Sequence, residues 1–100
     1  MKTVSLKLLT IIADEALQKR LIADVKKLGA KGYTLEKAYG EGAHGGRISQ
    51  WEGENIRLEL LVGAELADKI LEKLMRDYFE KYSIIAYLSD AQVLRGEKFL

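Results

Sequence analysis

The chain has 100 residues, of which 48% are hydrophobic and 31% are charged, and its formal net charge is +1. This composition is that of a single globular domain and excludes a disordered chain. The nearly balanced charge argues against a protein that coats nucleic acid non-specifically and against one that binds membranes electrostatically. The lack of cysteine excludes disulfides and thiolate metal sites.

The chain opens with a predicted strand followed by a predicted helix. The run Leu6–Ile12 is short and nearly all apolar, which is typical of a strand in the middle of a sheet. A helix is predicted over Glu15–Leu28, where one stripe of apolar residues recurs at helical spacing. The stripe consists of Leu17, Leu21, Val25 and Leu28. Asp14 is expected to cap the start of this helix, and Gly29 is expected to end it.

Further strands and one further helix are expected in the rest of the chain. Strands are predicted at Gly32–Tyr39 and Asn55–Val62, where side-chain character alternates, and at Ile84–Leu88. A helix is predicted over Ala64–Tyr82. Its apolar stripe consists of Ala67, Ile70, Leu71, Leu74, Tyr78 and Tyr82. Residues 89–100 are expected to form a short edge strand and a tail.

This order of elements predicts a ferredoxin-like α+β fold, βαββαβ, with a four-stranded antiparallel sheet and two helices on one face. The second face of the sheet then has no helix to cover it. On the third strand that face carries Arg57, Glu59 and Leu61. A face of such mixed character indicates burial against other copies of the chain, so self-association is expected.

The stretch Gly40–Ser49, GEGAHGGRIS, contains four of the nine glycines together with Arg47 and His44, the sole histidine. Glycines allow backbone N–H groups to converge into an anion site, to which Arg47 and His44 would add donors for a phosphate. Alternatively, the stretch is simply a mobile hairpin loop between two strands. It matches no phosphate-loop motif, and a lone histidine without cysteine does not predict a metal site.

Trp51 is the only tryptophan, and it lies close to the same glycine-rich stretch. The sequence offers no obvious core for it there. It either folds back onto the domain or contacts a partner, since tryptophan is enriched at interface hot spots.

Four stretches together are similar to one known family: KLLTIIADEALQKRL, GAKGYTLEKAYGEG, NIRLELLV and YFEKYSIIAYLSDAQVLRGEKF. The most telling runs are Gly29–Thr34 and Tyr78–Tyr87. In this order and at these spacings, they resemble the PII-like signalling proteins, and within them the SbtB-type regulators of bicarbonate uptake. The resemblance covers almost the whole chain and implies one PII-like domain over residues 1–100.

The resemblance implies a function as well as a fold. PII-like proteins are homotrimers that bind an adenine nucleotide (AMP, cyclic AMP, ADP or ATP) in clefts between neighbouring subunits. A T-loop, which corresponds to residues 40–53 here, senses the nucleotide and binds the target, a membrane transporter for bicarbonate in SbtB-type members. The related carboxysome-associated PII proteins bind adenine nucleotide and bicarbonate, which is the alternative. A cytoplasmic protein recruited to the membrane by its partner is implied, with no metal, nucleic acid or membrane insertion.

The resemblance also implies a set of site residues. Those implied in nucleotide binding are Gly32, Tyr33, Thr34, Gly42, His44, Arg47, Ile84, Ile85 and Arg95. Those implied in partner binding are Gly45, Gly46, Ile48 and Trp51. Arg47 matches an arginine of the SbtB-type loop, but Ala43 and His44 replace its serine and its other arginine. A neutral histidine binds phosphate less strongly than arginine, and a protonated one would make binding pH-dependent, so the phosphate contacts are expected to be altered.

Two other function classes use the same fold. A small enzyme of the acylphosphatase type needs a glycine-rich phosphate cradle directly after the first strand, where this chain has the acidic sequence IADE. An RNA-binding sheet needs exposed aromatic residues on its third strand, and Asn55–Val62 contains none. A non-enzymatic sensor is therefore expected, with a small ferredoxin-like enzyme as an alternative.

Overall fold

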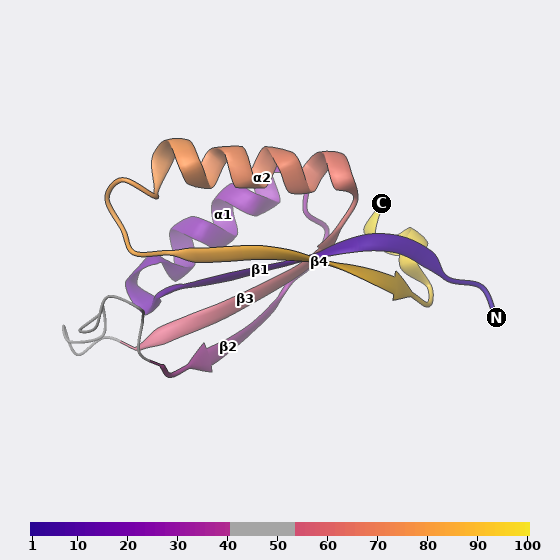
Figure 1. Cartoon of the computed structure of the whole chain (residues 1–100), viewed down its shortest axis with the longest axis horizontal. Coiled ribbons are helices and arrows are strands. Elements are labelled where there is room, and N and C mark those ends of the chain that lie inside the picture. The colour runs from indigo at the N-terminus through magenta and orange to yellow at the C-terminus, as the bar shows by residue number, and fades with distance from the viewer. Residues whose placement is uncertain (41–53) are drawn as a thin grey trace.

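The computed structural model describes residues 1–40 and 54–100 and shows two helices on one face of a four-stranded sheet (Figure 1). The elements follow in the order β1 (Val4–Asp14), the 3-10 turn η1 (Glu15–Leu17), α1 (Gln18–Leu28), β2 (Thr34–Ala38), β3 (Asn55–Val62), α2 (Ala64–Asp77), β4 (Ile85–Val93) and the 3-10 turn η3 (Gly96–Phe99). The strands lie in the order β2-β3-β1-β4, and every neighbouring pair is antiparallel. The predicted ferredoxin-like architecture is therefore confirmed.

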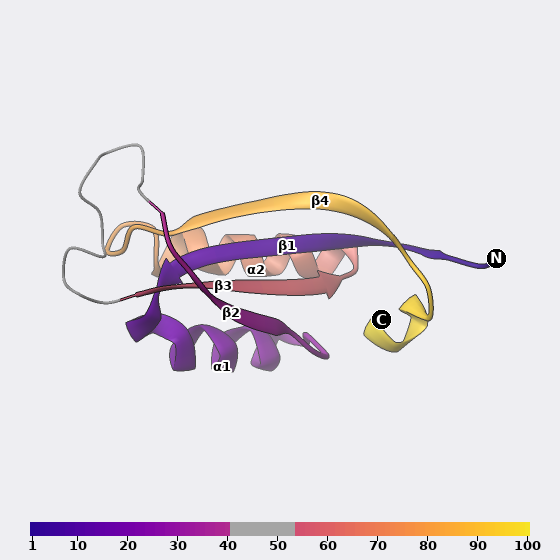
Figure 2. The same cartoon turned by 90° about the horizontal axis from the view of Figure 1, so that it is seen from below.

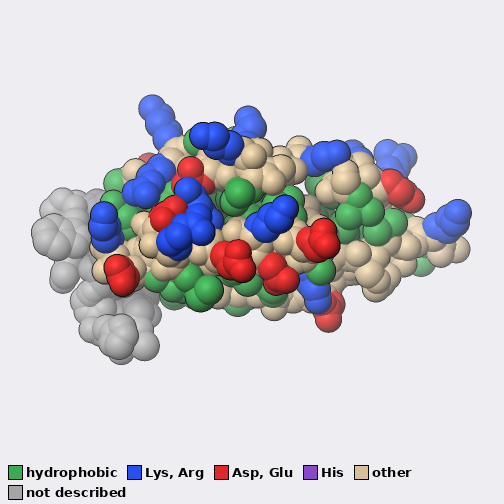
Figure 3. Space-filling view, turned by 90° about the horizontal axis from the view of Figure 1, so that it is seen from above, with side chains coloured by type: hydrophobic (Ala, Val, Ile, Leu, Met, Phe, Trp, Pro, Cys, Tyr) green, Lys and Arg blue, Asp and Glu red, His purple; other side chains and the backbone are tan. Residues whose placement is uncertain are grey.

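The core lies between the helices and the two central strands, β1 and β3. In their register Leu9 pairs with Leu60 and Ile11 with Leu58, and all four side chains are buried beneath the helices. The helix residues buried against them are Leu21, Val25, Ala67, Ile70 and Leu74. Full burial of an aliphatic side chain of this size contributes about 1.5–3 kcal/mol, so this layer is the main source of stability. The outer surfaces of the helices carry both basic and acidic side chains (Figure 3).

The start and the end of α1 follow the predicted signals. Asp14 accepts a hydrogen bond from the backbone N–H of Ala16 at 2.8 Å, and η1 precedes the helix. At the other end Gly29 has a φ of 125°, which glycine adopts without strain. The N–H groups of Gly29 and Ala30 donate to the last carbonyl groups of α1. The predicted Gly29 cap is confirmed, whereas Asp14 caps η1, and α1 itself begins at Gln18 rather than at the predicted Glu15.

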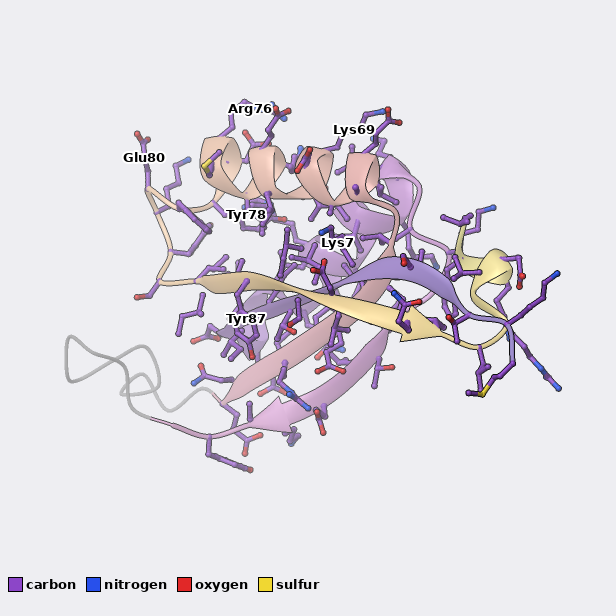
Figure 4. All side chains as sticks on the ribbon, turned by 45° about the vertical axis from the view of Figure 1, so that its right-hand side comes forward. Lys7, Lys69, Arg76, Tyr78, Glu80 and Tyr87 are labelled. Carbon is purple, nitrogen blue, oxygen red and sulfur yellow. The ribbon has the colours of Figure 1, made fainter. Side chains whose placement is uncertain are left out.

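Helix α2 ends at Asp77, whereas the sequence predicts a helix to Tyr82. The difference comes from Tyr78, which leaves the helical conformation at a φ of −123° and is fully buried. Its hydroxyl donates a 2.5 Å hydrogen bond to a carboxylate oxygen of Asp24 on α1. Burial, and then this hydrogen bond, raise the pKa of Tyr78 far above its usual range. Tyr78 therefore joins the two helices instead of extending the second (Figure 4).

Strand β4 runs to Val93, so residues 89–93, predicted as a separate edge strand, continue it. The extension has a partner because β1 begins at Val4, rather than at Leu6 as predicted, and Val4 pairs with Val93. The rest of the predicted tail forms η3. β4 is thus one long edge strand that pairs with β1 along its whole length.

The face of the sheet away from the helices, here called the open face, is not covered by any helix in residues 1–40 and 54–100 (Figures 1 and 2). Arg57 on this face forms ion pairs with Glu36 on β2 and Glu59 on its own strand. Hydrogen bonding to Glu36, and the charges of both carboxylates, raise the pKa of Arg57. On β4 the same face exposes the apolar side chains of Ile85 and Tyr87. The mixed character predicted for this face is confirmed.

We expect Tyr78→Phe to lower the free energy of unfolding by about 1.5–3 kcal/mol, because the packing of the ring is kept while a hydrogen bond to a charged carboxylate is lost. Urea unfolding at matched protein concentration measures the change. Tyr33→Phe is the control, since the Tyr33 side chain is exposed. Equal stability of the two variants would contradict the role assigned to Tyr78.

Candidate functional site

The predicted site residues that the structure describes fall into two groups. Gly32, Tyr33 and Thr34 lie at the start of β2, and Arg95 lies just beyond the end of β4. Because β2 runs in the same direction as β1 and β4 runs in the opposite one, the start of β2 and the end of β4 both face the end where β1 begins. These four residues are called the β2 half-site.

Ile84 and Ile85 lie at the start of β4, towards the end of the sheet where β1 finishes, and are called the β4 half-site. The end of β2 and the start of β3, which flank residues 41–53, lie at this same end (Figure 2). The remaining predicted residues lie outside the described part of the chain: Gly42, His44, Gly45, Gly46, Arg47, Ile48 and Trp51.

The register of the sheet fixes how far apart the two half-sites lie. One row across the four strands consists of Thr34, Glu59, Thr10 and Tyr87. Ile84 lies three positions before Tyr87. With about 4.8 Å between strands and about 3.4 Å per residue, Ile84 is about 18 Å from Thr34, and the two ends of β4 are about 27 Å apart. A compact ligand therefore contacts both half-sites only if they come from different copies of the chain.

The β2 half-site is completed by a turn that folds the C-terminal residues back across the end of the sheet. Arg95 adopts the left-handed conformation, with a φ of 59°, and directs the chain into η3. Gly96 lies so close to Val4 that a Cβ at position 96 would come within 2.8 Å of the Val4 Cβ, so the turn requires glycine. The ring of Phe99 lies 3.8 Å from the point that a Cβ on Gly32 would occupy. The turn thereby brings Arg95 and Gly32 to the same corner of the molecule.

The C-terminal turn adds charge and an aromatic ring to this corner. Within residues 1–40 and 54–100, Arg95 and Lys98 form no ion pair with a carboxylate. Phe99 is half-buried. Sequence reasoning did not select Phe99, because nothing in the spacing of the tail shows that it folds back onto Gly32. In the sequence of the tail, Gly96 is the residue that indicates a close approach of the backbone to another segment, because glycine has no side chain.

An ion pair joins the two chain ends that flank residues 41–53. The Nζ of Lys37 lies 2.9 Å from Oε1 of Glu54, and the hydroxyl of Tyr39 donates to Oε2 of the same carboxylate at 3.5 Å. The backbone N–H of Glu15 also donates to the Glu54 carbonyl at 2.7 Å. Hydrogen bonding to Lys37 holds the pKa of Glu54 below its usual value, and the same contact raises the pKa of Lys37. Sequence reasoning missed this pair because it depends on the register of β2 with β3.

The described groups of the two half-sites supply binding chemistry. The β2 half-site offers the hydroxyls of Tyr33 and Thr34 and the cation of Arg95, whereas the β4 half-site offers the apolar side chains of Ile84 and Ile85. A ligand with an anionic part and a flat or apolar part fits such a combination. In the described part of the chain, no three His, Cys, Asp or Glu side chains gather as a metal site. No helix there is both long and apolar enough to cross a membrane.

Comparisons with known proteins agree on one family. Residues 6–98 match the family model of the nitrogen regulatory protein P-II. A PII-like signalling protein from Thermus thermophilus is 50% identical, with all of both chains covered and a TM-score of 0.87. The protein CPII from Thiomonas intermedia, solved with bound ADP and bicarbonate, is 31% identical, with 99% of this chain and 98% of that chain covered and a TM-score of 0.85. CPII has also been solved with ADP, AMP and acetate.

We expect Lys37→Met to return the pKa of the Glu54 carboxyl towards its usual value, because the hydrogen bond and charge that lower it are lost. The ion pair adds stability above the unfolded-state pKa of Glu54, and that stability is lost as the pH falls through the native-state pKa. Carboxyl-carbon NMR titration of the wild type and the variant measures the shift. Lys27→Met is the control, and identical Glu54 titration in Lys37→Met and wild type would rule the contact out.

Proposed function

Because this chain belongs to the nitrogen regulatory protein P-II family, we propose that it is a non-enzymatic sensor that binds an adenine nucleotide between neighbouring copies of itself. The observation that carries the proposal is the separation of the two half-sites across one sheet. Family resemblance assigns both to the same ligand, yet one chain holds them about 18 Å apart. A cleft between two copies brings the β2 half-site of one against the β4 half-site of the other.

The chemistry of the half-sites supports a nucleotide as the ligand. Arg95 is an exposed cation at the β2 half-site, and guanidinium groups bind phosphate through paired, charge-assisted hydrogen bonds. Arg47, which matches an arginine of the SbtB-type loop, adds a second such donor. Ile84 and Ile85 give an apolar surface for a base or ribose. The similar protein CPII is bound to ADP, AMP and bicarbonate in its solved structures, which supports an adenine nucleotide here.

The open face supports assembly into the homotrimer that the family implies. Thr10 is already buried near its centre and Leu6 near the start of β1, whereas Ile85 and Tyr87 leave apolar surface exposed at its edge. Arg57 and its two carboxylate partners cover the other side of the face with paired charge. Packing this face against copies related by a closed rotation would cover the apolar edge.

We further propose that residues 40–53 act as the T-loop, which transmits nucleotide binding to a partner. The nucleotide must bind two states of this segment with different affinity for such a signal to pass. The partner that the SbtB-type resemblance favours is a membrane transporter for bicarbonate, contacted by Gly45, Gly46, Ile48 and Trp51. The protein would then be cytoplasmic and recruited to the membrane by that partner.

A second candidate function is a sensor that binds an adenine nucleotide together with bicarbonate, as carboxysome-associated PII proteins do. The observation that favours it is the likeness to CPII, whose solved structures hold both ligands. The two candidates share the nucleotide cleft and differ in whether bicarbonate is a ligand of the sensor or the cargo of its partner.

We expect saturable binding of ADP or AMP in titration calorimetry, with the affinity lowered about 10- to 100-fold by Arg95→Ala or Arg47→Ala, the range for a lost hydrogen bond to a charged group. Arg76→Ala is the control for net charge, since the Arg76 side chain lies on the outer side of α2 and points away from the sheet (Figure 4). Bicarbonate that changes the nucleotide affinity would favour the second candidate. No binding by the wild type, or equal effects of the Arg95 and Arg76 variants, would refute the proposed site.

A further inference from the structure

The loop that connects α2 to β4 carries the β4 half-site. After Tyr78 the chain makes a compact turn, in which the N–H groups of Lys81 and Tyr82 donate to the Tyr78 carbonyl at 3.0 and 2.9 Å. Ile84 then packs against the edge of the core, and Ile85 begins β4 with 53% of its surface exposed. The position of this turn decides where both isoleucines lie.

Arg20 of α1 contacts both tyrosines that frame the turn. Its guanidinium carbon lies 4.3 Å from the ring centre of Tyr78 and 5.9 Å from that of Tyr82. A guanidinium nitrogen also donates to the Tyr82 hydroxyl at 3.5 Å. The two rings have their centres 6.1 Å apart and are tilted by 52° to one another. A single side chain of α1 therefore contacts the first and the last residue of the turn.

The two tyrosines depend on Arg20 to different degrees. Tyr78 is fully buried and hydrogen-bonded to Asp24, so burial and that bond hold it in place without Arg20. Tyr82 is 37% exposed, and Arg20 of α1 contacts its side chain through a hydrogen bond and a cation–π contact. Loss of Arg20 would free the far end of the turn while the core stays intact.

We propose that Arg20 is a positioning residue, whose contacts with Tyr78 and Tyr82 hold the α2–β4 turn in the shape that presents Ile84 and Ile85 to the nucleotide. This inference rests on the proposed function. Arg20 lies on the exposed side of α1 and acts through the turn rather than on the ligand. Arginine suits this role because its planar guanidinium stacks on a ring and donates hydrogen bonds in its own plane, which the lysine ammonium does not do.

Titration calorimetry with ADP tests the inference in the full-length protein. Arg20→Ala and Lys19→Ala each remove one positive charge from adjacent exposed positions of α1. We expect the Kd for ADP to rise about tenfold in Arg20→Ala, a change within the range of cation–π contributions, and by less than about twofold in Lys19→Ala. Arg20→Lys is expected to behave like Arg20→Ala, because the ammonium keeps the charge but not the planar stacking.

Hydrogen exchange of the nucleotide-free protein separates positioning from general destabilisation. In Arg20→Ala we expect faster exchange of the amides of residues 79–84, which cover the turn after Tyr78 and the chain that leads from it into β4. We expect unchanged exchange in the core strands β1 and β3, because their packing does not involve Arg20. A merely structural effect of the substitution would speed exchange throughout the molecule.

Unchanged ADP affinity in Arg20→Ala, or unchanged exchange of the turn amides, would overturn the inference. Affinity lost in Arg20→Ala but kept in Arg20→Lys would also overturn it, since charge alone would then explain the effect. The titration of the wild-type protein is a separate result. If the wild type binds no adenine nucleotide, the proposed function fails and the ligand-positioning role falls with it, whatever Arg20→Ala does to exchange.

Discussion

The pairing of β1 with both β3 and β4 is the constraint on which the rest of the structure depends. The register with β3 aligns Leu9 with Leu60 and Ile11 with Leu58 under the helices, which fixes the core. The register with β4 places that strand on the edge opposite β2, so the starts of β2 and β4 lie on opposite edges of the sheet. A nucleotide site shared between copies, as we propose, follows from this geometry.

Each half-site is held by contacts of a different kind. At the β2 half-site the C-terminal turn packs closely in two places. No side chain would fit at position 96 against Val4, and the ring of Phe99 lies next to Gly32. At the β4 half-site a turn is held by side chains near the surface, with Arg20 as the contact that substitution can remove without opening the core. The β4 half-site is therefore the one whose shape a substitution can change while the fold remains intact.

The order of strands and helices was predictable because apolar residues alternate along β3 and recur at helical spacing in both helices. The end of α2 was not, since the apolar spacing continues through Tyr78, although that residue leaves the helical conformation and its hydroxyl binds Asp24. The half-site residues came from family resemblance and not from spacing. The Lys37–Glu54 pair and the contact of Phe99 with Gly32 join segments far apart in sequence, so only the folded chain reveals them.

A mixture of two binding-deficient variants tests most directly whether one ligand site is built from two copies of the chain. Arg95→Ala impairs the β2 half-site, and Ile85→Glu impairs the β4 half-site, which the two-copy cleft draws from the neighbouring copy. Both variants are unfolded, refolded together in equal amounts and titrated with ADP at a concentration that saturates only the wild-type protein. We predict recovery of about one quarter of the wild-type number of sites, because half of the copies carry each intact part and the two must meet. No recovery in the mixture, with each variant folded, would contradict a shared site and place the ligand within one chain.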